Sequence, residues 1–473
     1  MTARPPTAAP PAGAGRPVGL ILVAALAAFT ANLDLSIVNL ALPVIGDAFG
    51  TTQSELAWTV NAYVLPYAVS ILAVGRLADR FGHRRTLAAG AWLFALGSVV
   101  AAVAPGYAVL LVGRAVQGLG GAGLLTVGLA IVSANFSGAE RGRALGWYFA
   151  SGATAAVVGP LVGGLLTSLV GWPGIFWSQV PLALVVVGSA RAVLAAGSAG
   201  TRRSLDLPGL ALGSAVLFGI STALLQANAW GSTSPAVLGA WALAIVALAA
   251  FVARERATDE PAVRLGVFRS RIFVAAALVG GAAWFGILSG SVQLAIYLQS
   301  VRGLDATGAA LVLTPWPLVA GLLFPRSGAI VARIGPERVM IGSLVIAAVA
   351  AAAMTGFDRS TPFALVSLVA AIGGVPIALG VTASTMCALA EFAPSEAGIA
   401  SGVFNSLRQV GSSLGVAIPA AAFDLVLAGS AGSDLLAGSV GAFASRAVVF
   451  LIVLGLAGAI MPRRSVATQA ASA

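Results

Sequence analysis

The chain has 473 residues, of which 59% are hydrophobic and 9% are charged, and its 26 basic and 16 acidic residues give a net charge of +10. Soluble domains carry about 25% charged residues, and one soluble core cannot bury this much apolar surface, so the composition excludes a soluble protein and predicts a membrane protein. The basic excess does not indicate a nucleic-acid partner, because no stretch combines a basic face with a soluble fold.

The chain begins with 17 residues that are rich in Pro, Ala and Gly, and we expect them to form a disordered cytoplasmic tail. The apolar run that follows contains Asn and Asp and lacks a small-residue cleavage site. We therefore expect a retained helix there and not a signal peptide.

Fourteen apolar stretches follow, each long enough to cross a hydrocarbon core of about 30 Å with about 20 residues. The predicted spans are residues 18–43, 56–77, 86–105, 107–133, 142–168, 173–195, 207–228, 236–253, 272–299, 307–332, 337–357, 361–390, 399–425 and 443–461. One buried soluble helix can imitate a span, but fourteen in series cannot, so the sequence predicts an all-α integral membrane protein.

Arginine placement predicts the orientation in the membrane. Twenty of the 26 arginines fall in segments that share one side of the membrane with the N-terminus, and the segment 75–85 (GRLADRFGHRR) alone holds four of them. Because cytoplasmic loops carry the excess of basic residues, both termini are predicted to be cytoplasmic.

Two sequence echoes indicate an internal duplication. The segment 75–85 returns in weaker form at 328–338, an offset of 253, and AERGRALG at 139–146 returns as SEAGIASG at 395–402, an offset of 256. We therefore expect a disordered tail at 1–17, an N-terminal six-helix half at 18–195, an inserted two-helix segment at 196–265, a C-terminal six-helix half at 266–462 and a cytoplasmic tail at 463–473.

Four motifs in the first half support a family resemblance. They are NLDLSIVNLALP (32–43), GRLADRFGHRR (75–85), LVGRAVQGLGGA (111–122) and GATAAVVGPLVGG (152–164). With these motifs the chain resembles the fourteen-helix drug:proton antiporter branch of the major facilitator superfamily. The resemblance implies a fold of six, two and six helices, with a substrate site near the middle of the bilayer between the halves.

The resemblance is imperfect at GWPGIFWSQVP (171–181). Pro173 stands where relatives have an arginine, and Gln179 stands in place of an asparagine. This departure leaves the subfamily, and therefore the substrate, open.

The resemblance assigns the loop after the second span to a conformational latch. Its residues are Gly75, Asp79, Arg80, Gly82, Arg84 and Arg85. Arginines at a helix end anchor it to lipid headgroups, but anchoring explains neither the carboxylate nor the two glycines. We expect Asp79 to meet the positive N-terminus of a helix of the other half near residue 399 when the cytoplasmic side is closed.

Asp34 and Arg114 are the candidate proton-coupling pair. Both lie at a similar depth inside apolar spans, where an ionised carboxylate is costly unless a cation is near. Movement between paired and unpaired surroundings could load and release a proton. Two other uses of Asp34 stay open, a permanent structural ion pair and direct contact with a cationic substrate.

The fifth span carries a stripe of small residues around a proline. Gly152, Gly159 and Gly163 fall on one helical face, and Pro160 removes a backbone hydrogen bond. We expect this face to form a hinge against the opposite half, with ordinary helix packing as the alternative.

Several polar or amphipathic side chains lie inside apolar spans and are candidates for a substrate cavity. They are Asn32, Asn61, Tyr63, Gln117, Gln293, Tyr297, Asn405 and Arg408. For Arg408 the alternative is that the side chain extends to the cytoplasmic interface.

The sequence lacks a nucleotide-binding loop, a metal-ligand cluster and the motifs of hydrolytic enzymes, so we expect neither catalysis nor a cofactor, metal, nucleotide or nucleic-acid partner. The family resemblance implies a bacterial cell-membrane exporter that exchanges protons for drugs, antibiotics or other amphiphilic molecules. The alternatives are an exporter of one endogenous metabolite and a non-transporting membrane scaffold. The oligomeric state stays open, with a monomer favoured.

Overall fold

The computed structural model describes residues 17–195, 206–258, 261, 263–429 and 434–461, and these residues are almost entirely helical, without strands. The predicted tails at 1–17 and 463–473 lie outside the described residues, apart from Pro17. Residues 196–205 are also outside them, so the predicted limits 18–195, 196–265 and 266–462 stay predictions.

The helices follow the chain in three groups. The first comprises α1 (Pro17–Phe49), α2 (Gln53–Leu56), α3 (Trp58–Phe81), α4 (His83–Ala102), α5 (Tyr107–Asn135), α6 (Gly138–Val170) and α7 (Pro173–Val193). The second comprises α8 (Leu207–Trp230) and α9 (Pro235–Ala257). The third comprises η1 (Leu265–Arg269), α10 (Arg271–Ile296), η2 (Tyr297–Val301), α11 (Ala306–Leu313), α12 (Pro315–Ile334), α13 (Pro336–Met354), α14 (Phe363–Ala390), η3 (Pro394–Glu396), α15 (Ala397–Gly429) and α16 (Leu435–Ile460).

The predicted number of membrane spans is confirmed, because fourteen of the described helices are long and apolar enough to cross a bilayer. The predicted start of the last span at residue 443 is wrong. The helix α16 begins at Leu435, because the Asp434 carboxylate caps it by accepting hydrogen bonds from the backbone N–H groups of Leu436 (3.1 Å) and Ala437 (3.3 Å). This earlier start places Arg446 well inside the helix.

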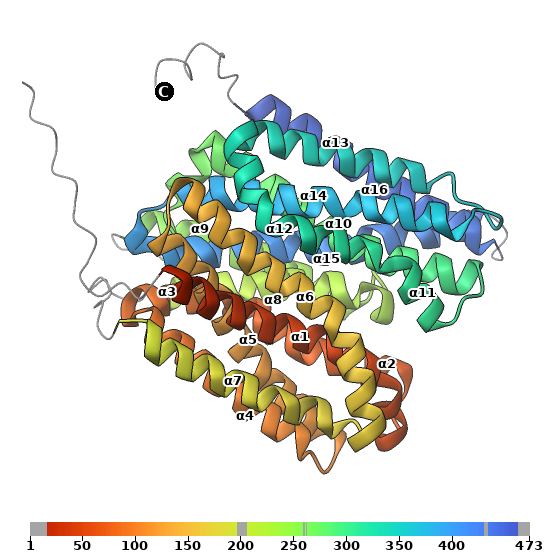
Figure 1. Ribbon diagram of the computed structural model, residues 1–473, viewed down its shortest axis with the longest axis horizontal. Helices are drawn as coiled ribbons and strands as arrows, with labels where there is room; N and C mark the ends of the chain where they lie inside the picture. Colours follow the sequence, from red (N-terminus) through yellow and green to blue (C-terminus); the bar gives the residue numbers. More distant parts are fainter. Residues whose placement is uncertain (1–16, 196–205, 259–260, 262, 430–433, 462–473) are drawn as a thin grey trace, which may run out of the picture.

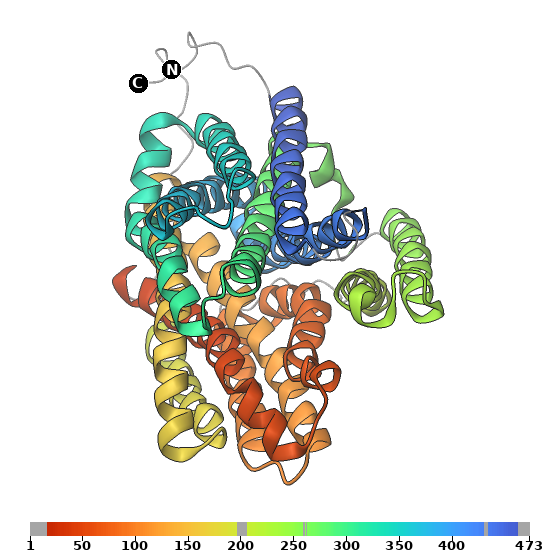
Figure 2. The same ribbon diagram turned by 90° about the vertical axis from the view of Figure 1, so that its right-hand side faces the viewer.

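The three groups have different places in the molecule. Helices α1 to α7 pack together on one side and α10 to α16 on the other (Figure 1). The pair α8 and α9 stands at the margin in the second view (Figure 2), where α8 packs against both α3 and α15. The Ser214 hydroxyl of α8 donates to the carbonyl oxygen of Val69 in α3 (2.7 Å).

Glycines allow the two large groups of helices to meet at close range. A Cβ atom on Gly75 of α3 would lie 2.4 Å from the carbonyl oxygen of Gly398 in α15, and one on Gly146 of α6 would lie 2.3 Å from that of Phe324 in α12. No other residue type fits such an approach without backbone movement. These two helix pairs therefore close one end of the molecule.

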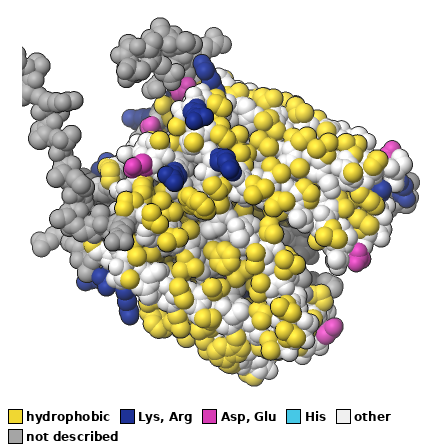
Figure 3. All heavy atoms as spheres, viewed as in Figure 1, with side chains coloured by type: hydrophobic (Ala, Val, Ile, Leu, Met, Phe, Trp, Pro, Cys, Tyr) yellow, Lys and Arg dark blue, Asp and Glu magenta, His cyan; other side chains and the backbone are white. Residues whose placement is uncertain are grey.

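The outer surface matches a membrane environment. Hydrophobic side chains cover most of the face in Figure 3, the acidic side chains lie toward its two ends, and several basic ones extend inward from the upper left. Large exposed side chains such as Leu161, Leu169 and Leu425 are at least 71% exposed, which is costly in water and favourable in lipid. The assignment of the closed end to the cytoplasm stays a prediction from arginine placement.

Candidate functional site

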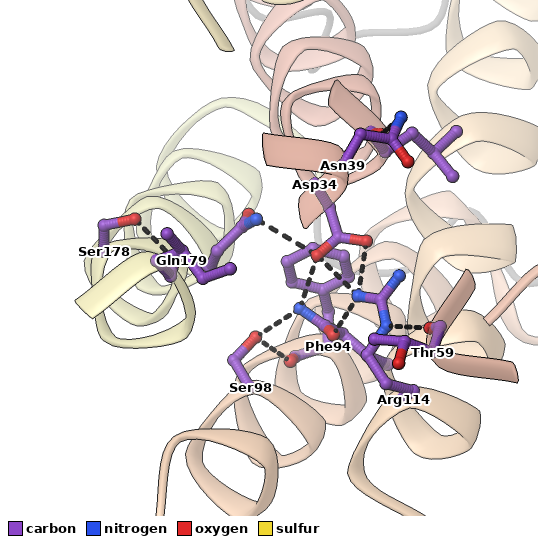
Figure 4. Close-up of polar contacts among 11 residues, drawn as sticks. Asp34, Asn39, Thr59, Phe94, Ser98, Arg114, Ser178 and Gln179 are labelled. Carbon is purple, nitrogen blue, oxygen red and sulfur yellow. Dashed lines mark hydrogen bonds and ion pairs between the residues drawn. The ribbon is translucent and has the colours of Figure 1, made fainter. Parts of the chain in front are cut away.

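The first element of the site is a buried ion pair between α1 and α5. Arg114 Nη1 donates to Asp34 Oδ1 (2.8 Å) and Oδ2 (2.7 Å), and both side chains are 0% exposed. Asp34 Oδ1 also accepts from Gln117 Nε2 (3.0 Å) and Gln179 Nε2 (3.1 Å), so two helices, α5 and α7, supply donors to this carboxylate of α1 (Figure 4). A buried carboxylate needs such a set of donors to stay ionised.

A second layer of hydrogen bonds positions this pair. Arg114 Nε donates to the carbonyl oxygen of Thr59 (2.9 Å), and Gln117 Nε2 donates to Ser98 Oγ (2.9 Å). One guanidinium nitrogen, Arg114 Nη2, is buried without a hydrogen-bond acceptor in the part of the chain that the structure describes. The cluster therefore holds one spare donor that a rearranged partner could use.

The ion pair is separated from the centre of the molecule by an aromatic ring. The Arg114 guanidinium carbon lies 4.7 Å from the centroid of the Tyr63 ring, and Tyr63 lines the central cavity on its other side. Asn32 and Ser36 of α1 also line the cavity, whereas Asp34, between them in sequence, does not. In this conformation the carboxylate has no direct contact with the cavity.

The central cavity lies between the two large groups of helices and has a volume of about 600 Å³. Pockets that bind drug-sized ligands have volumes of about 300–1,000 Å³. Its wall is largely apolar and aromatic, with contributions from Tyr67, Phe149, Trp284, Trp316 and Phe324. The cavity can therefore hold an amphiphilic small molecule.

Five of the eight candidate cavity residues line this space. They are Asn32, Asn61, Tyr63, Asn405 and Arg408.

The other three candidates, Gln117, Gln293 and Tyr297, do not line this cavity. Gln117 belongs to the Asp34 cluster, Gln293 is buried within α10, and the Tyr297 hydroxyl donates to the carbonyl oxygen of Asp358 (2.6 Å). Sequence shows how deep a polar side chain lies in a span, but the rotation of the helix decides which neighbour it faces.

Arg408 lies in the cavity wall and not at the membrane interface. It is 6% exposed, and its guanidinium carbon lies 4.4 Å from the Trp284 ring centroid and 5.3 Å from that of Phe149. Its Nη1 donates to Asn405 Oδ1 (3.1 Å). Aromatic faces stabilise a cation that water cannot reach freely.

The predicted latch carboxylate makes the contact that the sequence indicates. Asp79 Oδ1 accepts from the backbone N–H of Gly398 (2.7 Å), and Oδ2 accepts from that of Ile399 (2.8 Å). These donors belong to the first turn of α15, where the unpaired N–H groups and the helix dipole favour an anion. The contact joins the two large groups of helices, and its role as a latch stays a prediction.

The other predicted latch residues have separate surroundings. Gly82 adopts a φ of +87° at the turn between α3 and α4, a conformation that favours glycine. The Arg80 guanidinium carbon lies 5.5 Å from the Phe81 ring centroid, while Arg84 is half-buried and Arg85 is exposed.

The prediction that the small-residue face of α6 packs against the opposite half is wrong. A Cβ on Gly159 would meet Ser36 and one on Gly163 would meet Ile37, so both glycines face α1 of their own half. Gly152, nearer the middle of α6, lies beside Asn32 and also lines the cavity. Pro160 lies within α6, which continues from Gly138 to Val170. A hinge at these residues stays a prediction, without the expected contact to the other half.

Two functional candidates lay outside the sequence prediction. Gln179 donates to Asp34. The departure from the family pattern at Gln179 is the feature of the sequence that could have indicated this role. Arg446 is 5% exposed and donates through Nε to Ser289 Oγ (3.0 Å). Because the last span is predicted to begin at residue 443, Arg446 falls near the end of that span and does not stand out in the sequence as a buried charge.

The comparison with known families identifies the fold. The sequence profile of the Major Facilitator Superfamily matches residues 24–416. The chain belongs to the major facilitator superfamily. It is therefore a multi-pass membrane transporter of the cell membrane and not an enzyme.

Relatives of this superfamily member are named as resistance and export proteins. The methylenomycin A resistance protein of Streptomyces coelicolor is 34% identical over 422 residues, 87% of each chain. The tetracenomycin C resistance and export protein of Streptomyces glaucescens is 31% identical, over 85% of this chain and 75% of that protein. The multidrug resistance protein Stp of Mycobacterium tuberculosis is 31% identical, over 84% of this chain and 74% of that protein.

Solved structures show the same fold at low identity. The proton:xylose symporter XylE has a TM-score of 0.67 at 14% identity, covering 94% of this chain and 96% of that one. The human organic anion transporter MFSD10 has a TM-score of 0.66 at 16% identity, covering 95% of this chain and all of that one.

Proposed function

We propose that this transporter exports drugs, antibiotics or other amphiphilic molecules in exchange for protons, by alternating access. The observation that carries the proposal is the buried Asp34 carboxylate, which pairs with Arg114 next to a cavity of drug size. A titratable group in a membrane span is costly to keep, and it is a strong candidate for a proton site.

Proton binding at Asp34 changes the contacts of the whole cluster. A proton from the outer side converts the carboxylate to a neutral acid, which weakens the ion pair with Arg114 and frees the guanidinium to seek another acceptor. The Tyr63 ring lies against Arg114 and lines the cavity. Rearrangement of Arg114 therefore changes the cavity wall, and substrate release and proton uptake become linked.

The two conformations of the cycle differ at the closed end of the molecule. The contact of Asp79 with the start of α15, and the close approach of α6 to α12, stabilise the conformation described here. With the predicted orientation this conformation faces outward. Opening of these contacts exposes the cavity to the cytoplasm, where Asp34 returns its proton and the substrate binds.

The test of proton coupling is Asp34→Asn in proteoliposomes with an imposed pH gradient. We expect gradient-driven efflux to fall at least tenfold, while substrate binding without a gradient persists, since asparagine retains a hydrogen-bond acceptor but cannot titrate. The matched control is Asp424→Asn, which changes an exposed acid of α15 outside the cavity. Undiminished gradient-driven efflux by Asp34→Asn removes this residue from the mechanism.

A dedicated exporter of one metabolite is the second candidate function. It is favoured by relatives that are each named after a single antibiotic, tetracenomycin C or methylenomycin A. Susceptibility profiling of a deletion strain separates the two functions, because multidrug export predicts broad hypersensitivity and a dedicated exporter predicts a change for one compound class.

A further inference from the structure

We propose that the substrates of this transporter are amphiphilic organic anions, whose carboxylate or phenolate oxygen binds at Arg408, Trp284 and Asn405. The inference rests on the proposed export function and names its substrate class. It departs from the alternative in which Asp34 binds a cationic substrate directly.

The charge of the cavity wall has one sign. Among the described residues that line the cavity, Arg408 is the only charged one, and no aspartate or glutamate is present. Asp34 lies outside the lining and its charge is matched by Arg114. A cationic substrate would therefore meet like charge without a compensating acid, whereas an anion would meet the opposite charge of a guanidinium that is largely shielded from water.

Three buried donors of this wall have no acceptor. Among the described residues, Arg408 Nε, Trp284 Nε1 and Asn405 Nδ2 are each buried without a hydrogen-bond partner, as are the hydroxyl oxygens of Tyr63 and Ser413, which also line the cavity. A buried N–H group without an acceptor costs free energy, so an array of them is a site prepared for an incoming acceptor. Three of these five unmatched groups can only donate, and the two hydroxyls can donate as well, which favours an oxygen-rich anionic group over an ammonium group.

Aromatic rings pack around the guanidinium group of Arg408, and its in-plane N–H groups are proposed to bind the ligand. The rings of Trp284 and Phe149 lie 4.4 and 5.3 Å from the guanidinium carbon, and Phe404 lies 5.9 Å from it. Ring contacts stabilise the charge, while the N–H bonds in the guanidinium plane remain suited to a carboxylate. Phe149 belongs to α6 and Trp284 to α10, so an anion bound here contacts both halves.

The binding test uses three probes with the same pyrene body and different head groups. They are 1-pyrenebutyrate, its neutral amide and 1-pyrenebutylammonium, titrated into purified wild-type protein in detergent without a pH gradient. We expect the carboxylate to bind at least tenfold more tightly than the ammonium compound. Equal or tighter binding of the ammonium compound overturns the proposal.

Variants locate the anion site within the cavity. Arg408→Gln should raise the Kd of the carboxylate at least tenfold and that of the amide less than twofold, and Trp284→Phe, which removes one donor but keeps a ring, should raise the carboxylate Kd about threefold. The control Arg326→Gln removes an exposed arginine of α12 outside the cavity and should change neither Kd. An unchanged carboxylate-to-amide ratio in Arg408→Gln overturns the proposal, and the same outcome in Trp284→Phe does so if Arg408→Gln fails to fold.

The binding experiment and the coupling experiment test different proposals, and each can give a negative result without the other. Loss of the head-group preference with intact dependence of efflux on Asp34 overturns only the substrate class. A preserved preference together with undiminished efflux by Asp34→Asn overturns proton coupling at that residue and leaves the anion site in place.

Discussion

The two halves of this transporter bury their arginines in different ways. In the first half, Arg114 of α5 meets the carboxylate of Asp34 of α1. In the second half, Arg408 and Arg446 have no carboxylate within ion-pair distance among the described residues, and they contact aromatic rings, a serine and the sulfur of Met354.

The two clusters involve positions that the predicted duplication relates to each other. Asp34 and Ser289 are 255 positions apart, and Ser98 and Met354 are 256 apart, close to the offsets of 253 and 256 that predict this duplication. Ser98 accepts a hydrogen bond in the Asp34 cluster, and Ser289 and Met354 both accept from Arg446. The second half therefore has a related polar cluster without the titratable acid, which favours proton exchange in the first half and anion binding in the second.

The largest expected effect comes from breaking the ion pair in the first half. Arg114→Leu leaves a buried carboxylate without its cation and should lower the free energy of unfolding by about 3–5 kcal/mol, measured by thermal or denaturant unfolding in detergent. In the double variant Asp34→Leu/Arg114→Leu the loss should be smaller than the sum of the single losses. Additive losses would show that the two side chains do not depend on each other.

An intermediate effect is expected at the contact that joins the halves. Asp79→Asn replaces one of two accepting oxygens by an amide and removes the charge, so it should weaken the closed end by about 1.5–3 kcal/mol. A cysteine placed at Ser401, which is 0% exposed in the first turns of α15, should react faster with a water-soluble thiol reagent in the variant. The control Asp358→Asn changes an exposed carboxylate elsewhere and should leave labelling unchanged. Equal labelling in Asp79→Asn contradicts a latch.

The smallest expected effect comes from giving the second half the acid that it lacks. Ser289→Asp places a carboxylate beside Arg446 and should gain about 1 kcal/mol of coupling with it, measured by a double-mutant cycle with Arg446→Met. Ser289→Asn has a similar size without the charge and is the matched control. If Ser289→Asp shows no more coupling than Ser289→Asn, the two clusters are not equivalent in geometry.

The sequence predicted features that depend on local composition and depth. The fourteen spans follow from the lengths of apolar runs, and the contact of Asp79 near residue 399 follows from the family resemblance together with the affinity of an acid for a helix N-terminus. Asp34 and Arg114 could be expected to meet because they lie at a similar depth in a medium where both need a partner.

Other features were decided by the tertiary structure. Gln117 joins the ion pair while Arg408 faces the cavity, and Gly159 meets α1 while Gly146 meets α12. In these spans most faces are apolar, so the sequence carries little information on which face turns inward. The rotation of each helix is set by the summed packing of all its neighbours, and that sum exists only in the folded bundle.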